Sequence, residues 1–154
     1  MCAIDVIVPV FNGARFVDRC LGSVVGQSFP AEKIFVVNNG STDETQSILE
    51  KWAERYLQIE IIQLPLAGVN AARNAGIKCS NAEFIAFLDI DDVWMPRKLA
   101  QQLKVFRGAT DSLGLVYGGQ LIINEAGNKI DGVGKNEPVM RGELYQALLH
   151  EGNL

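Results

Sequence analysis

The fold is decided by the stretch Lys33-Ile34-Phe35-Val36-Val37-Asn38-Asn39-Gly40-Ser41-Thr42-Asp43-Glu44. After Lys33, four residues form an apolar run rich in β-branched side chains, which predicts a buried strand. Asn-Asn-Gly ends that strand. Ser41 followed by Glu44 is a capping-box pattern, with Ser41 expected to be a helix N-cap and nothing more. The stretch therefore predicts a strand that turns directly into a helix.

The same alternation extends along the chain in both directions from this stretch. The expected strands are Ile4 to Val10, Lys33 to Val37, Ile59 to Leu64, Phe84 to Leu88 (buried on both faces) and Leu115 to Ile123. The expected helices are Ala14 to Val25, one opened at Ser41, Val69 to Lys78, one with Pro96 in its first turn, and Arg141 to Leu149. Strands alternating with helices over short connections predict an α/β fold, a Rossmann-like three-layer α/β/α sandwich around a mostly parallel sheet.

Composition limits the class of protein. The chain has 154 residues, 48% of them hydrophobic and 21% charged, which fits one compact domain. Its net charge of -4 argues against a nucleic-acid partner. Cys2, Cys20 and Cys79 show neither metal-like nor paired spacing. Neither a signal peptide nor an apolar run of about 18 residues is found, so we expect no membrane span. We expect a cytoplasmic protein, with peripheral attachment to the inner face of a membrane as the alternative.

The residues that follow the predicted strands carry most of the functional information. Parallel strands place their carboxyl ends at one edge of the sheet, and ligands bind there. An aromatic residue, amides, a cation and carboxylates are expected to meet at this edge: Phe11, Asn12, Asn38, Asn39, Arg73, Asp89, Asp91 and Asp92. This convergence predicts a polar ligand site.

The carboxylates of Asp89, Asp91 and Asp92 repel one another unless a positive charge lies among them. Oxygen ligands suit Mg²⁺ or Mn²⁺, and either ion could join this acidic site to a diphosphate. The alternative is that these residues only cap the following helix or form a solvated turn.

Several other residues have two interpretations. Phe11 either stacks on a base or closes the core, and Arg73 either positions a base or phosphate or is a surface charge. Asn38 and Asn39 could serve only to shape a turn. Trp94 either packs against the next helix or lines the edge. His150, the lone histidine, is expected to have no catalytic role.

Other nucleotide and nucleophile chemistries lack their motifs. The first strand-to-helix turn, Asn12-Gly13-Ala14, has one glycine and not the Gly-x-Gly-x-x-Gly of dinucleotide sites. The sequence also lacks the Gly-x-x-x-x-Gly-Lys-Ser/Thr phosphate loop and the Gly-x-Ser-x-Gly elbow.

Four ordered motifs carry a resemblance to a known family. They are Ile7-Val8-Pro9-Val10-Phe11-Asn12-Gly13, Val36-Val37-Asn38-Asn39-Gly40-Ser41-Thr42-Asp43, Gly68-Val69-Asn70-Ala71-Ala72-Arg73-Asn74-Ala75-Gly76, and Phe87-Leu88-Asp89-Ile90-Asp91-Asp92 followed by Pro96. In order and spacing the sequence from about Ile4 to Phe106 resembles family 2 glycosyltransferases.

This resemblance implies a GT-A fold and the inverting transfer of a hexosyl group from a nucleotide-diphosphate sugar, UDP-linked in the leading interpretation. The acceptor would be a saccharide or a lipid-linked saccharide, as in polysaccharide biosynthesis. The implied nucleotide-binding residues are Pro9, Val10, Phe11, Asn12, Asn38, Asn39, Arg73, Asp89, Ile90 and Asp91. The implied ligands of Mg²⁺ or Mn²⁺ are Asp91 and Asp92.

The sequence departs from the family pattern at three places. Phe11 replaces the usual Tyr, and Asn38-Asn39 replaces the usual acidic pair, which predicts weaker or altered base recognition. No catalytic base is identified, and we expect it beyond Leu154. Residues 1–154 are therefore interpreted as one nucleotide-sugar-binding domain, truncated before its acceptor half. The alternative is a non-catalytic nucleotide-binding or scaffold relative. A nucleotidyltransferase is disfavoured because the first loop is not rich in glycine and basic residues.

Overall fold

The computed structural model describes residues 3–66, 68–110, 112–124 and 126–130. The chain divides into two compact units, Met1–Ser112 and Leu113–Leu154, each described here by itself. The first unit alternates strands and helices throughout. Its elements are β1 (Ile4–Val10), α1 (Val17–Val25), β2 (Ile34–Asn39), α2 (Thr45–Arg55), β3 (Ile59–Leu64), α3 (Val69–Cys79), β4 (Phe84–Phe87) and α4 (Lys98–Arg107).

The sheet of this unit is four-stranded, with the order β3-β2-β1-β4. All three strand pairs are parallel, and the pairing of β1 with β2 runs from Val6 opposite Ile34 to Val10 opposite Asn38. The predicted α/β fold with a mostly parallel sheet is therefore confirmed. Every residue of β1 and β2 is buried, as expected for central strands covered on both faces.

Pro9 lies in the central strand β1 at the point where the pairing of β1 with β4 ends. The carbonyl of Ile7 accepts a hydrogen bond from the backbone N–H of Leu88, so Ile7 faces β4. Pro9 lies two residues further and faces the same side, but β4 ends at Phe87. The next donor of this parallel ladder would be the N–H of residue 9, which proline lacks, so the pairing of β1 with β4 ends here.

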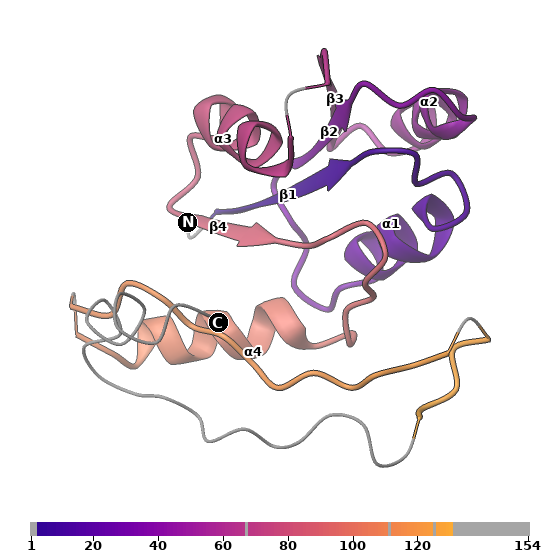
Figure 1. The fold of residues 1–154 in the computed structure, drawn as a ribbon. Helices are drawn as coiled ribbons and strands as arrows, with labels where there is room; N and C mark the ends of the chain where they lie inside the picture. The colour runs from indigo at the N-terminus through magenta and orange to yellow at the C-terminus, as the bar shows by residue number, and fades with distance from the viewer. Residues whose placement is uncertain (1–2, 67, 111, 125, 131–154) are drawn as a thin grey trace, which may run out of the picture. The chain divides into compact units, whose positions relative to one another are not determined.

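Helices cover both faces of the sheet (Figure 1). Helices α1, α2 and α4 bury Leu21, Leu49 and Leu103 in one hydrophobic cluster against one face. Helix α3 packs Ala72 against Ile7, with Phe35 and Val37 in the same cluster on the other face. The result is the predicted three-layer sandwich.

Helix α3 lies very close to β1, and Gly76 permits this approach. A Cβ atom built on Gly76 would lie 2.6 Å from Cγ2 of Ile7, which is closer than packed carbon atoms allow. The small residue at position 76 therefore allows α3 to pack directly on the central strand.

Three predicted helix starts were placed too early. Helix α2 begins at Thr45 and makes no side-chain hydrogen bond at its N-cap, so the interpretation of Ser41 as its cap is wrong. Helix α1 begins at Val17 and α4 at Lys98, two residues after Pro96. Before α2 and before α1, the residues expected to be helical hydrogen-bond to another loop instead of extending the helix.

The expectation that the fourth strand is buried on both faces is also wrong. Phe84 and Ala86 pack on the cluster beneath α1 and α4, whereas Ile85 and Phe87 are exposed. Among the described residues β4 is paired only with β1, so it is the last strand of the sheet order. An apolar run indicates a strand, but it does not indicate which of its faces is covered.

In the second unit the fifth strand, Leu115 to Ile123, is not found. The described residues there form one isolated antiparallel bridge, between Ile123 and Lys129, around a turn at Gly127. Gly118 and Gly119 interrupt the apolar run with two residues that disfavour a strand interior. The predicted helix Arg141 to Leu149 and His150 lie outside the described residues. No helix in the described part of the chain is long and apolar enough to cross a membrane.

Candidate functional site

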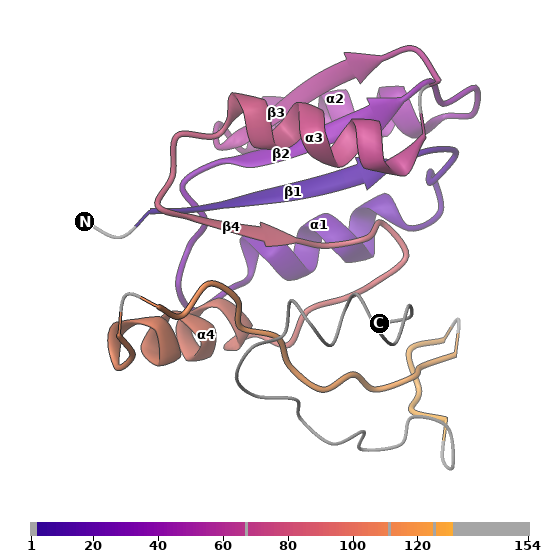
Figure 2. The ribbon, with the colours of Figure 1, turned by 60° about the vertical axis from the view of Figure 1, so that its left-hand side comes forward.

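The candidate site lies at the carboxyl edge of the sheet. The strands β1, β2 and β3 point the same way in Figure 2, and the loops that follow them leave from one side. Phe11 follows β1 directly and is 48% exposed. The interpretation that Phe11 closes the core is therefore wrong, because its ring is open to solvent at this edge. Pro9 and Val10, just before it, are buried within β1.

The loops after β1 and β2 are joined through Asn12. Its backbone N–H donates to the Ser41 hydroxyl at 3.0 Å, and its side-chain oxygen accepts from the backbone N–H of Thr42 at 2.8 Å. Asn12 has a φ of 50°, a left-handed conformation that asparagine tolerates better than most residues. Ser41 thus connects two loops.

Asn38 and Asn39 are the last two residues of β2, and both are buried. The side chain of Asn38 is fully engaged within the protein. Its oxygen accepts from the backbone N–H of Ser41 at 3.1 Å, and its amide donates to the oxygen of Gln46 at 2.9 Å. The side-chain oxygen of Gln46 also accepts a hydrogen bond from the amide of Gln63. Asn38 therefore shapes the turn after β2, as one of its two interpretations proposed.

Arg73 joins the third loop to the fourth. Its guanidinium lies 2.6 Å from a carboxylate oxygen of Asp89, and both side chains are partly exposed. Helix α3 supplies the arginine from its first turns, and the loop after β4 supplies the carboxylate. Arg73 is therefore held at the acidic loop, where a planar cation can contact a phosphate or a base.

The acidic cluster forms a tight turn. The backbone N–H of Asp92 donates to the carbonyl of Asp89 at 3.0 Å, and the side chains of Asp91 and Asp92 are exposed. Partial burial raises the pKa of Asp92 above its ordinary value, and the charges of Asp91 and Asp89 raise it further. The charged form is thus disfavoured in the absence of a nearby cation.

Helix α1 contacts this turn through Cys20. The thiol of Cys20 lies 3.8 Å from the carbonyl oxygen of Asp89. Burial raises the pKa of Cys20 to about 12, with smaller contributions from Asp92, Asp91 and Asp89, so the thiol stays protonated. Gln27 holds the next segment, donating to the carbonyl of Met95 at 2.8 Å and accepting from the N–H of Leu99 at 3.1 Å.

Trp94 belongs to the hydrophobic cluster on this face and is buried. The ammonium group of Lys98 lies 4.4 Å from the centre of its ring. Of its two interpretations, packing against the following helix is therefore the correct one.

The described residues include no group of three or more His, Cys, Asp or Glu side chains placed to hold a metal ion. Asp89 is already paired with Arg73, so Asp91 and Asp92 are the carboxylates available. One or two carboxylates, with the remaining ligands from water and substrate phosphates, are typical of Mg²⁺ sites. The residues thus fit an ion that is shared with a diphosphate.

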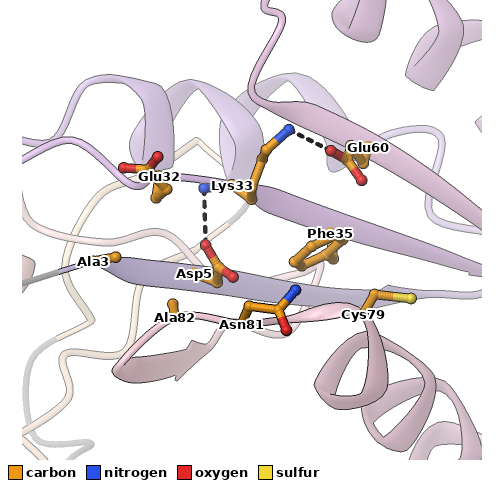
Figure 3. A pocket seen from close by; sticks show the side chains of 9 residues that line it. All are labelled: Ala3, Asp5, Glu32, Lys33, Phe35, Glu60, Cys79, Asn81 and Ala82. Atoms are coloured by element: carbon orange, nitrogen blue, oxygen red, sulfur yellow. Dashed lines mark hydrogen bonds and ion pairs between the residues drawn. The ribbon is translucent and has the colours of Figure 1, made fainter.

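A depression lies at the amino edge of the sheet (Figure 3). A depression of about 630 Å³ is lined by Ala3, Asp5, Glu32, Lys33, Phe35, Glu60, Cys79, Asn81 and Ala82. Its buried carboxylate, Asp5, accepts from the backbone N–H of Lys33 at 3.0 Å and from the Ser80 hydroxyl at 2.6 Å. The side chain of Lys33 forms an ion pair with Glu60. These polar groups join the starts of the strands to one another.

Comparison with known proteins identifies the family. The model of the family described as Glycosyl transferase family 2 matches residues 5–145. The chain belongs to glycosyltransferase family 2. An uncharacterized glycosyltransferase of Nostoc sp. (strain PCC 7120) is 33% identical over 152 residues, which are 97% of this chain and 46% of that protein.

Solved structures agree with this family and with the GT-A fold. The structure of S. aureus TarS 1-349 in complex with UDP-GlcNAc superposes with a TM-score of 0.64 and 26% identity, covering 75% of this chain and 37% of that one. The mannosyltransferase PcManGT from Pyrobaculum calidifontis, in complex with GDP-Man and Mn²⁺, gives a TM-score of 0.61 at 28% identity, covering 66% and 31%. The chain spans less than half the length of each of these three proteins.

In this family 2 chain the structure brings together most of the predicted site residues. Phe11, Asn12, Arg73 and Asp89 lie in loops or first helical turns at one edge. Sequence reasoning missed Gly13, Asp43, Thr45 and Gln46, which hydrogen-bond between these loops. The capping-box spacing of Ser41 and Glu44 gives no signal for these residues, because their partners lie in another loop.

Proposed function

We propose that this chain binds a nucleotide-diphosphate sugar, UDP-linked in the leading case, and supplies the donor- and metal-binding part of an inverting glycosyl transfer. The observation that carries the proposal is the Arg73–Asp89 ion pair at 2.6 Å, beside the exposed Asp91 and Asp92 at the carboxyl edge. It supports the proposal because a cation and two further carboxylates lie together at the edge where ligands of parallel sheets usually bind.

The proposed roles follow from exposure and charge. Phe11 offers an exposed ring for stacking on the base, and the buried Asn39 lies at the end of β2 beside it. Arg73 lies near the base or phosphates, and Asp89 contacts the ribose while holding Arg73. Asp91 and Asp92 would hold Mg²⁺ or Mn²⁺, which when bound neutralises charge on the leaving diphosphate.

In the proposed reaction an acceptor hydroxyl of a saccharide or lipid-linked saccharide attacks the anomeric carbon. A carbon–oxygen bond forms there as the bond to the diphosphate breaks, and configuration inverts. The hydroxyl proton passes to a carboxylate base. No base is assigned to the described residues, so the proposed contribution of this chain is to bind and orient the donor. We place the reaction in the cytoplasm or at the inner face of a membrane.

A non-catalytic nucleotide-binding or scaffold relative is the second candidate. It is favoured by Asn38 and Asn39, which stand where the family pattern has an acidic pair, and by the full engagement of the Asn38 side chain. Asp91 and Asp92 argue against it, because a scaffold does not need two exposed neighbouring carboxylates at this edge.

Calorimetric titration of the chain with UDP, GDP and dTDP, with and without Mn²⁺, tests the proposal. We expect one nucleotide to bind, and to bind more tightly with Mn²⁺. Absence of binding at millimolar concentration would overturn the proposal and favour the scaffold. We also expect little or no sugar transfer by this polypeptide alone, and robust transfer would contradict that part.

A further inference from the structure

Besides the hydrogen bonds of Asn12, a second set of hydrogen bonds joins the loop after β1 to the start of α2. The backbone N–H of Gly13 donates to the hydroxyl of Thr45 at 2.9 Å, a buried contact, and the N–H of Ala14 donates to a carboxylate oxygen of Asp43 at 3.2 Å. These partners are separated by 32 and 29 positions in sequence. The first loop is therefore bound to the start of α2 along successive backbone groups.

The Thr45 hydroxyl is the centre of this connection. It accepts from Gly13 and at the same time donates to the second carboxylate oxygen of Asp43. Thr45 is fully buried, so water cannot replace either partner. A hydroxyl is the side-chain group of this size that donates and accepts at once, so serine can replace threonine here and valine cannot.

Asp43 is held in its charged form by the same contacts. Partial burial works to raise the pKa of Asp43, but hydrogen bonds from the side chain and backbone of Thr45 and from the backbone of Ala14 outweigh it and lower the pKa. Asp43 is therefore a permanent acceptor for the first loop at neutral pH.

Gly13 also connects the hydrogen-bonded group of Asp43 and Thr45 to the acidic loop after β4. A Cβ atom on Gly13 would lie 2.7 Å from Cγ2 of Val10 and 2.9 Å from Cγ1 of Ile90. The backbone of Gly13 is thus packed between the Thr45 hydroxyl and the Ile90 side chain, which lies between Asp89 and Asp91. Phe11 is two residues from this fixed point, and Asn12 between them has a φ of 50°. Such constrained surroundings keep Asn12 in its left-handed conformation.

We infer that Asp43 and Thr45 form a clamp that positions Phe11 for the nucleotide base, with Thr45 as its central positioning residue. The inference rests on the proposed function, since it assigns the clamp to the same nucleotide site. The clamp fixes the exposed ring before the ligand arrives. Binding then does not have to order the loop, which would otherwise reduce affinity.

The test compares Thr45→Val with Thr45→Ser in the full 154-residue chain. Titration with UDP, GDP and dTDP in the presence of Mn²⁺ gives the affinity of each variant. We expect Thr45→Val to weaken binding of the preferred nucleotide by about tenfold and Thr45→Ser to restore affinity to near that of the parent chain. Leu49→Val, on the same helix and fully buried, is the control for a general loss of stability.

Amide hydrogen exchange of Gly13 gives a readout that needs no nucleotide. We expect protection in the parent chain and in Thr45→Ser, and its loss in Thr45→Val but not in Leu49→Val. An unprotected Gly13 in the parent chain overturns the clamp. If the parent chain binds a nucleotide and Thr45→Val binds it equally well, or Leu49→Val weakens binding as much, the positioning role alone is wrong. If the parent chain binds none of the three nucleotides, the proposed function fails and the positioning role fails with it.

Discussion

At the amino edge of the sheet the carboxylate of Asp5 is buried and accepts hydrogen bonds from Lys33 and Ser80. At the carboxyl edge Asp91 and Asp92 are exposed, and the pKa of Asp92 is raised by burial and by its acidic neighbours. Both edges carry acidic residues, but the buried carboxylate of Asp5 has its partners within the protein, whereas Asp91 and Asp92 are exposed. The difference indicates that Asp5 stabilises the fold, whereas Asp91 and Asp92 are available to a ligand.

The strongest test of this contrast uses one phenylalanine from each edge. Phe35 is 3% exposed, so Phe35→Ala should reduce the free energy of unfolding by about 3–5 kcal/mol. Phe11→Ala should reduce it by only about 1 kcal/mol, because about half of Phe11 is already exposed. Urea denaturation measures both values.

The same Phe11→Ala variant should bind its preferred nucleotide less tightly by about 1–3 kcal/mol, the usual contribution of base stacking. Phe11→Tyr is the matched variant that keeps the ring and should retain affinity. A large loss of stability in Phe11→Ala with unchanged nucleotide affinity would reverse the assignment of the two edges.

The next effect concerns charge at the carboxyl edge. Asp91→Asn and Asp92→Asn should each weaken Mn²⁺-dependent nucleotide binding by about 10–100-fold, since a neutral amide is a poorer ligand for a hard cation. Calorimetry with and without Mn²⁺ measures the change. Glu83→Gln, an exposed residue before β4, removes the same charge and should have no effect. Equal losses of nucleotide affinity in all three variants would show that only the net charge of the chain affects binding, which would contradict a metal site at Asp91 and Asp92.

A smaller effect on stability is expected at the amino edge. Asp5→Ala leaves the N–H of Lys33 and the hydroxyl of Ser80 without their acceptor, which should reduce the free energy of unfolding by about 1–3 kcal/mol. Denaturation measures this, and Glu32→Ala on the exposed surface beside it should change stability by less than about 0.5 kcal/mol. Nucleotide binding should be the same in both variants, and a loss confined to Asp5→Ala would assign a ligand role to the amino edge.

The smallest effect distinguishes the two asparagines at the end of β2. Asn39→Asp should tighten nucleotide binding by about 3–10-fold, because a carboxylate accepts from a base N–H more strongly than an amide does. Asn38→Asp removes the amide that donates to Gln46, so we expect it to lower stability. Titration of UDP, GDP and dTDP against both variants decides the matter, and unchanged affinity in Asn39→Asp would contradict the predicted role of that residue.

The sequence by itself determined the order of strands and helices in the first unit and the edge at which the candidate site residues lie. Apolar runs and helical period are local properties, and parallel strands then require that Phe11, Arg73 and Asp89 leave from one side. The strand Ile59–Leu64 was predicted with its observed bounds.

Tertiary structure decided which partners the polar side chains take. Ser41, Asp43 and Glu44 have the spacing of a helix cap, yet Ser41 and Asp43 hydrogen-bond to a loop 29 residues away. Ile85 and Phe87 belong to an apolar run, yet they are exposed because β4 lies at the end of the strand order. Hydrogen-bond partners and covered faces depend on residues distant in sequence, and local pattern carries no information about them.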